Sequence, residues 1–170
     1  IKIDIFLVFN REKLPEDSKY SDFNCKLIWT NKRYSYAEGM NRAIEIIGCN
    51  NYDYFLICND DITLDSSDFL SNLSSQIITE KPDIMGFDIL APTLPTIPST
   101  SCYQKPCSTC VLPSKGLEEG TIMLINSSVI SSIGLFDQSY EAYCEEMDFQ
   151  LRAIKVGYTI SHSSLMVWHH

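Results

Sequence analysis

The sequence lacks the features that tie a chain to a membrane or to nucleic acid. None of its apolar runs reaches the roughly 18 residues that a membrane-spanning helix needs. Basic residues are also scarce: 13 Lys and Arg stand against 22 Asp and Glu, which gives a net charge of −9. A phosphate backbone is bound through a basic surface, so this balance argues against a nucleic-acid partner. It is compatible with the binding of divalent cations.

A secretory signal pattern is missing too, because the opening run from Ile1 to Asn10 is short and carries Asp4. We therefore expect a cytoplasmic protein, with any peripheral membrane contact made by parts of a larger protein outside this sequence. The 170 residues suffice for one domain with a sizeable core. The apolar fraction of 45% and the charged fraction of 21% are typical of globular proteins.

The seven cysteines do not form a clear framework of disulfides or metal ligands. Four lie among apolar neighbours and are interpreted as small core residues: Cys25, Cys49, Cys58 and Cys144. Three cluster in one polar stretch: Cys102, Cys107 and Cys110. That cluster is compatible with zinc ligands, with a redox pair or with no function, since no fourth ligand and no second Cys-x-x-Cys is apparent.

Apolar periodicity predicts strands that alternate with helices. Strands are expected over 3–9, 25–29, 54–58, 84–90, 121–125, 158–160 and 165–168. Helices are expected over 36–47, from Ser66 or Ser67 to 78, over 127–133 and over 145–156. The proline-rich stretch 92–115 is expected to be a long irregular loop. This alternation predicts an α/β fold, namely an α/β/α sandwich around a central, mainly parallel, Rossmann-like mixed sheet.

The strand expected over 54–58 runs directly into Asn59, Asp60 and Asp61. Carboxylates at the carboxyl end of a buried strand lie where open α/β sheets bind ligands. Adjacent acids repel each other unless a cation or a shared proton relieves them. Their oxygens suit Mg²⁺ or Mn²⁺, ions that usually accompany phosphates. The alternative is a solvated turn that leads into the next helix.

A second acidic cluster, Glu145, Glu146 and Asp148, opens the helix expected over 145–156. Acids in a first helical turn are favoured by the helix dipole, so simple charge placement is one interpretation. The other is catalysis, because a carboxylate in a crowded acidic site can have its pKa raised and act as a general base. At the far end, His169 and His170 follow a predicted strand, which is compatible with a metal-ligand role.

Taken in order, these motifs resemble the family-2 glycosyltransferases of the GT-A fold, and the resemblance spans most of the chain. The similar segments are Phe6 to Glu12, Arg33 to Asn41, Asn59 to Asp61, Gly120 to Ile125, Ile133 to Asp137, Glu145 to Asp148 with Arg152, Gly157 with Tyr158, and Val167 to His169. Three residues depart from the family pattern: Arg33 and Ser35 replace an Asn and a Gly, and Asn59 replaces the first acid of the metal motif. Between Glu16 and Cys25 there is little room for the family's second strand and its base-contacting Asp.

The resemblance implies one compact catalytic domain over 1–170, with a donor half over about 1–90, an acceptor half over about 116–170 and a linking loop over 91–115. It implies inverting transfer of a sugar from a UDP-, GDP- or dTDP-sugar to a hydroxyl of a glycan or glycoconjugate acceptor. Two other functions stay open at this point: a non-catalytic nucleotide-sugar-binding module, and a metal-dependent nucleotidyltransferase, which needs no base at Glu146.

The resemblance also implies a set of site residues. The general base is Glu146, and the acceptor contacts are Glu145, Asp148 and Gly120. The donor contacts are Phe9, Asn10, Arg11, Arg33, Asn41, Asn59 and Asp60. The ligands of Mn²⁺ or Mg²⁺ are Asp61 and His169.

Overall fold

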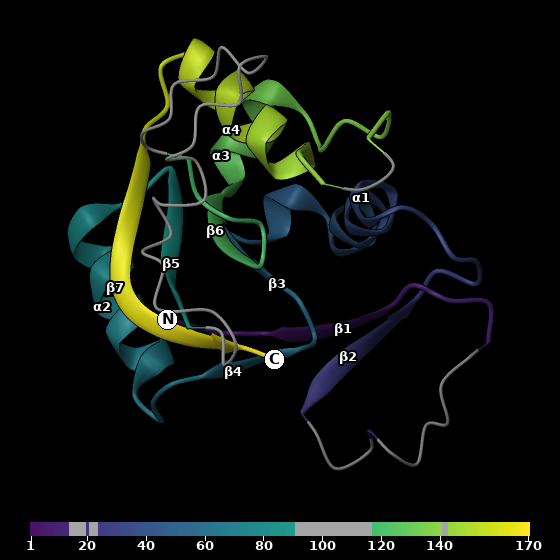
Figure 1. Cartoon of the computed structure of the whole chain (residues 1–170), viewed down its shortest axis with the longest axis horizontal. Coiled ribbons are helices and arrows are strands. Elements are labelled where there is room, and N and C mark those ends of the chain that lie inside the picture. Colours follow the sequence, from purple (N-terminus) through teal and green to yellow (C-terminus); the bar gives the residue numbers. More distant parts are fainter. Residues whose placement is uncertain (14–19, 21–23, 91–116, 141–142) are drawn as a thin grey trace.

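A computed structural model describes residues 1–13, 20, 24–90, 117–140 and 143–170 (Figure 1). The strands are β1 (Ile5–Phe9), β2 (Cys25–Trp29), β3 (Tyr54–Cys58), β4 (Ile62–Leu64), β5 (Ile84–Leu90), β6 (Ile122–Asn126) and β7 (Ile160–His169). The helices are α1 (Tyr36–Ile47), the 3₁₀ turn η2 (Cys49–Asn51), α2 (Phe69–Glu80), α3 (Ser127–Ile133) and α4 (Glu145–Lys155). The cysteine cluster and the predicted loop 91–115 lie outside the described residues, and the division into donor and acceptor halves stays a prediction.

The central sheet has five strands in the order β3-β6-β5-β7-β4. The pairs β3–β6, β5–β6 and β4–β7 are antiparallel, and only β5–β7 is parallel among the pairs of this sheet that the structure describes. Strands β1 and β2 form a separate parallel pair. The prediction of a mainly parallel sheet is therefore wrong: the central sheet is mostly antiparallel.

The error has a physical cause. Alternate residues of β3 enter two different cores: Phe55 and Ile57 pack on one face of the sheet, while Tyr54 and Leu56 pack on the other. A continuous apolar run shows that both faces of a strand are covered, as is usual in parallel sheets. It says nothing of the direction in which the neighbouring strand runs.

Helices cover both faces of the sheet, which gives three layers (Figure 1). On one face α1, α3 and α4 enclose a core that includes Ile84, Ile125 and Phe149. On the other face α2 packs its Phe69 and Leu73 against Phe87 and its neighbours. The predicted α/β/α layering thus agrees with the structure, although the strand directions do not.

The C-terminal strand also differs from the expectation. Two short strands were expected, whereas β7 runs unbroken for 10 residues. The apolar pattern did not predict one long strand because the middle of β7 is polar. Ser163 is buried there and donates a hydrogen bond to Gln76 Oε1 at 2.8 Å. The end of β7 pairs with the short strand β4, which the sequence did not reveal, and this pairing sets Ile62 opposite His169.

Asn41 ties helix α1 to the other side of the fold. Its side chain is 2% exposed, and Nδ2 donates to Phe136 O at 2.8 Å while Oδ1 accepts from Phe136 N at 3.0 Å. The Phe136 ring packs against Phe149 of α4 at a centroid distance of 4.9 Å. One amide therefore fixes the segment between α3 and α4 against α1.

Asn41→Ala is expected to lower the free energy of unfolding by about 2 kcal/mol or more, because it leaves a buried N–H and a buried C=O of Phe136 unpaired. Urea unfolding measures this loss. Asn51→Ala is the matched control, since the exposed Asn51 side chain donates a hydrogen bond to Ile47 O within the same stretch of chain. Equal stability of the Asn41→Ala and Asn51→Ala proteins would contradict a structural role for Asn41.

Candidate active site

The acid motif after β3 meets the end of β7 in the structure. Asp61 Oδ1 lies 3.3 Å from His169 Nε2, and the Asp61 carbonyl accepts a hydrogen bond from His170 N at 2.9 Å. The antiparallel pairing of β4 with β7 causes this approach between residues far apart in the sequence. The two residues predicted to bind a metal are thus brought together.

The chemistry of this pair fits one particular kind of metal site. An Asp oxygen and a His nitrogen are ligands that Mn²⁺ accepts, and Mg²⁺ is often held by one or two carboxylates together with substrate phosphates. Across the described part of the chain, no group of three or more His, Cys, Asp or Glu is arranged to hold a metal. Asp61 and His169 therefore fit an ion whose coordination is completed by a substrate phosphate. They do not form an all-protein metal cage.

Asn59 and Asp60 lie beside this pair. The Asn59 N–H donates to Thr121 O at 2.9 Å, which holds the acid motif next to the start of β6. Asp60 is exposed at the tip of the turn between β3 and β4. The donor contacts predicted for these two residues stay predictions.

The head of α4 separates its two adjacent glutamates. Glu145 is 6% exposed, and its Oε2 is buried with no hydrogen-bond partner in the described structure. Glu146 lies half-buried against Gly120, where an added Cβ would come within 3.0 Å of Glu146 Cγ. Neighbouring helical residues project about 100° apart, so the two carboxylates have different surroundings.

Burial raises the pKa of Glu146; backbone N–H groups at the head of α4 lower it in part, and the charges of Glu145 and Glu119 raise it. The net direction is upward. A carboxylate with a raised pKa is a better proton acceptor near neutral pH, as general-base catalysis requires. The half-buried site of Glu146 is therefore suited to that role.

The Asp148 carboxylate forms an ion pair with Arg152 in the same helix. Its Oδ2 accepts from Arg152 Nε at 2.7 Å, and Arg152 also donates to the carbonyls of Ile133 and Leu135. This arrangement links α4 to the end of α3. The acceptor contact predicted for Asp148 is not tested by this geometry.

Three of the predicted donor residues, Phe9, Asn10 and Arg11, lie at the end of β1. Asn10 is bonded to the backbone of Tyr34, accepting from its N–H at 2.9 Å and donating to its O at 3.0 Å. The Arg11 guanidinium lies 5.0 Å from the centroid of the Phe9 ring, and Arg33 is exposed. Asn10 and buried Asn41 therefore hold the surrounding backbone in place, whereas the two arginines lie at the surface. Direct contact of these residues with a nucleotide stays a prediction.

No family model matches the chain, and no curated protein matches its sequence. Solved structures do match. S. aureus TarS in complex with UDP-GlcNAc is similar with a TM-score of 0.66 and 14% identity, over 89% of this chain and 44% of that one. The mannosyltransferase PcManGT from Pyrobaculum calidifontis, in complex with GDP-Man and Mn²⁺, has a TM-score of 0.60 and 10% identity, over 90% of this chain and 41% of that one. The chain has the fold of the GT-A glycosyltransferases.

At these identities the likeness establishes the fold alone. The chain spans less than half the length of TarS 1–349 and of PcManGT, with 44% and 41% covered. No helix in the described ranges is both long and apolar enough to cross a membrane.

One cavity lies away from the acid motif after β3 and from the head of α4. It measures about 690 Å³ and is lined by residues around the start of β3 and the end of α2, among them Tyr52, Asp53 and Lys81. None of the predicted site residues lines it. We place the candidate site by its chemistry, at the end of β3 where Asp61 lies and at the head of α4, and not by cavity size.

Gln150, which fixes the backbone of Glu118 next to the head of α4, was not identified from the sequence. Gln150 is fully buried; its Oε1 accepts from Glu118 N and its Nε2 donates to Glu118 O, both at 2.7 Å. Nε2 is also 3.2 Å from Glu146 O. A polar residue one helical turn after Glu146 on the face that carries Met147 was the available signal.

Glu146→Gln is expected to stabilise the protein at neutral pH. Because the pKa of Glu146 is raised in the folded state, its favourable contribution is complete below its ordinary value of 4.5 and is lost as the pH rises through the raised value. The neutral amide avoids that loss. Urea unfolding should therefore give a higher midpoint than wild type at neutral pH, and a nearly equal one in mild acid.

Asp137→Asn is the control of opposite sign for this experiment. Hydrogen bonds from Ser139 lower the pKa of Asp137, so its contribution is present above its ordinary value of 3.8 and is lost as the pH falls. This variant should be less stable than wild type at neutral pH. If Glu146→Gln is also less stable than wild type at neutral pH, the raised pKa of Glu146 in the folded state would be contradicted.

Proposed function

We propose that this protein is an inverting glycosyltransferase, similar to those of family 2, that transfers a sugar from a nucleotide-diphosphate donor to an acceptor hydroxyl. The observation that carries the proposal is the position of Glu146, half-buried against Gly120 at the head of α4 in a GT-A fold. The order of motifs along the sequence supports the same family.

Glu146 acts as the general base in this proposal. The acceptor oxygen attacks the anomeric carbon as the bond from that carbon to the diphosphate breaks, and the hydroxyl proton passes to the Glu146 carboxylate. Attack from the side opposite the leaving diphosphate inverts the anomeric centre. A positioned base typically contributes a factor of about 10²–10⁴ to such a step.

Glu145 is proposed to orient the acceptor. Its buried Oε2 is without a hydrogen-bond partner in the described structure, which is costly unless a ligand group fills that position. An acceptor hydroxyl can donate to it. Burial and then the charge of Glu145 raise the pKa of neighbouring Tyr36, so this phenol stays protonated and its hydroxyl donates to Gly120 O at 3.4 Å.

On the donor side, Asp61 and His169 would hold Mn²⁺ or Mg²⁺, and such an ion, when bound, stabilises negative charge on a departing diphosphate. Two comparison structures, TarS with UDP-GlcNAc and PcManGT with GDP-Man and Mn²⁺, support a donor of the UDP- or GDP-sugar class. Exposed Arg11 and Arg33 are proposed to contact the nucleotide, where a guanidinium can bind a phosphate through two hydrogen bonds.

Glu146→Gln is expected to lower turnover by roughly 10²-fold or more, with little change in donor affinity, because it removes the base and keeps its shape. Release of the nucleotide from UDP-GlcNAc or GDP-mannose in the presence of Mn²⁺ measures turnover. Glu145→Gln, on the neighbouring residue, should mainly raise the KM for acceptor. If Glu145→Gln is inactive and Glu146→Gln is not, the roles of the two residues are reversed. If both variants keep wild-type turnover, the proposed mechanism fails.

Asp61→Ala is expected to abolish metal-dependent turnover while the far-UV circular dichroism and the unfolding midpoint stay near wild type, because Asp61 is exposed and contributes little to the core. Asp65→Ala is the matched control, since exposed Asp65 accepts from Trp168 Nε1 at 2.8 Å on the neighbouring stretch. Full activity of the wild type in excess chelator would refute the metal assignment.

A further inference from the structure

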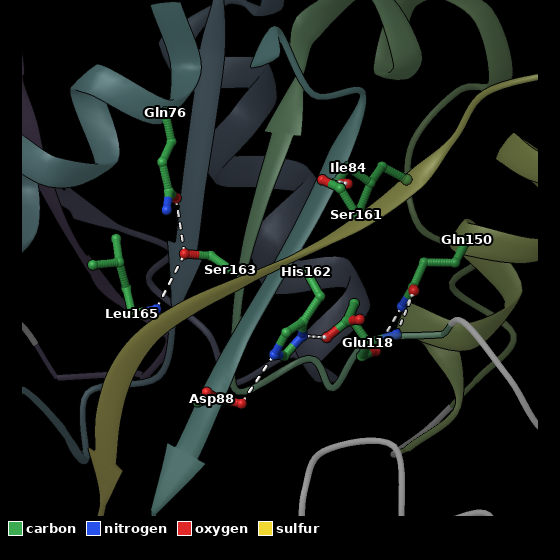
Figure 2. Close-up of polar contacts among 9 residues, drawn as sticks. All are labelled: Gln76, Ile84, Asp88, Glu118, Gln150, Ser161, His162, Ser163 and Leu165. Carbon is green, nitrogen blue, oxygen red and sulfur yellow. Dashed lines mark hydrogen bonds and ion pairs between the residues drawn. The ribbon is translucent and has the colours of Figure 1, made fainter. Parts of the chain in front are cut away.

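A network of charged side chains lies beside the proposed site and plays no part in the chemistry above. His162 Nδ1 lies 2.9 Å from Glu118 Oε2, and His162 Nε2 lies 2.9 Å from Asp88 Oδ1 (Figure 2). His162 belongs to β7, Asp88 belongs to β5, and Glu118 precedes β6. A ring nitrogen bonds to a carboxylate oxygen only when a proton lies between them. The network therefore holds one proton more than a neutral imidazole and two carboxylates carry.

The extra proton has two possible positions. On His162 it makes an imidazolium that donates to both carboxylates, and on Glu118 it makes an acid that donates to Nδ1. Partial burial works to lower the pKa of His162, but the hydrogen bonds of Glu118 and Asp88 outweigh it and the net direction is upward. Burial raises the pKa of Glu118, His162 offsets part of this, and the charges of Asp88 and Glu119 add to it. The network thus keeps its proton to a higher pH than a free histidine does.

The side chain of Glu118 is buried against Gly86 of β5. The residue is 5% exposed, and a Cβ on Gly86 of β5 would collide with Glu118 Oε2, so this strand position has room only for a glycine. Gln150 of α4 bonds to both the N–H and the C=O of Glu118. Glu118 is therefore held by its carboxylate at the sheet and by its backbone at α4.

The segment that Glu118 anchors also contacts Glu146. Gly120 lies two residues after Glu118 and packs on the Glu146 side chain. We propose that His162 is a positioning residue: by holding Glu118 against the sheet, it fixes Gly120 over Glu146 and shields that carboxylate from water. The inference rests on the proposed role of Glu146 as the base. After loss of the extra proton the neutral imidazole keeps one N–H, which can bond only one of the two carboxylates, so the hold on Glu118 weakens and the cover over Glu146 loosens.

A pH dependence follows from the raised pKa of His162. Its contribution to folding is complete below the ordinary value of 6.5 and is lost as the pH rises through the raised value. The groups that set this titration are Asp88 on β5, Glu118 and, through Glu118, its neighbour Glu119. Turnover should therefore fall on the alkaline side, in addition to the fall on the acid side where Glu146 is protonated.

The decisive experiment titrates Glu146 by carboxyl ¹³C NMR in the wild type and in His162→Gln. The glutamine amide carries no charge, and its one nitrogen does not replace the two separate ring nitrogens that face Glu118 and Asp88. Since burial is the largest cause of the raised pKa of Glu146, this pKa should fall toward 4.5 in His162→Gln. Ser163→Ala is the control: it breaks the bond from the next β7 residue to Gln76 on the opposite face of the sheet and should leave the titration of Glu146 unchanged (Figure 2).

Kinetics with UDP-GlcNAc or GDP-mannose and Mn²⁺ provide the second measurement. At neutral pH, kcat of His162→Gln should fall roughly 10- to 10²-fold with little change in the donor KM, as expected when a catalytic group is slightly misplaced. His162→Arg should recover much of this loss and show no alkaline fall, because a guanidinium stays charged and can donate to two carboxylates. Ser163→Ala should keep the wild-type pH profile.

An unchanged pKa of Glu146 in His162→Gln would overturn the proposal, as would wild-type turnover in a variant whose Glu146 pKa has fallen. If His162→Gln does not fold, Glu118→Gln provides the same test, because it removes the charge and keeps the size of the side chain. If the wild type turns over neither sugar nucleotide, the proposed function fails by itself. The carboxyl titration still decides whether His162 positions Glu146.

Discussion

The pairing of the short strand β4 with the end of β7 is the interaction on which the donor side of the site depends. Without it, Asp61 would not be held beside His169, because the two residues are far apart in the sequence. The backbone hydrogen bonds between β4 and β7 place Ile62 opposite His169. Asp61, the residue before Ile62, therefore lies at the same end of this strand pair as His169. An ion held there needs further oxygen ligands, and a diphosphate supplies them. The proposed metal site therefore needs only Asp61 and His169 from the described part of the chain, in which no group of three or more metal-ligating side chains is found.

A second constraint governs the acceptor side. The segment 117–120 lies between the sheet and the head of α4, and polar side chains hold it from both directions: His162 from β7 and Gln150 from α4. Such buried polar contacts are specific in direction, whereas apolar packing alone tolerates sliding. Burial is the largest cause of the raised pKa of Glu146, and Gly120 of this segment packs on the Glu146 side chain. The proposed role of Glu146 as the general base therefore depends on the packing around it as much as on the residue itself.

The strands and helices could largely be predicted from the sequence, because their apolar periodicity is local. The expected ranges 54–58 and 36–47 agree with β3 and α1, and the helix at 145 begins where the acids begin. Strand direction could not be predicted in this way, since an apolar run reports only that both faces are covered. The short strand β4 and the polar middle of β7 were missed for a related reason: both owe their conformation to partners far away in the sequence.

The same distinction applies to the candidate site. Glu146, Asp61 and His169 stand out because acids and histidines follow predicted strands or open a helix. No such pattern marks Glu118, His162 and Asp88. These residues come together only in the folded structure, where β5 pairs with β7 and His162 lies opposite Gly86. Asn10 and Asn41, which the motifs match to nucleotide binding, also hold backbone segments together, a role that the sequence did not indicate. Their contact with a nucleotide stays a prediction.

The central claim of the proposal is that a nucleoside diphosphate and a metal bind together at the start of β4 and the end of β7. Paramagnetic broadening of backbone amide signals by Mn²⁺, in ¹⁵N-labelled protein, tests it most directly. With UDP or GDP present, the amides of Asp61, Ile62 and His169 should broaden first, and without nucleotide the effect should be much weaker. Broadening centred on Tyr52, Lys81 and Asn126, which line the cavity of about 690 Å³ at the start of β3, would contradict the account.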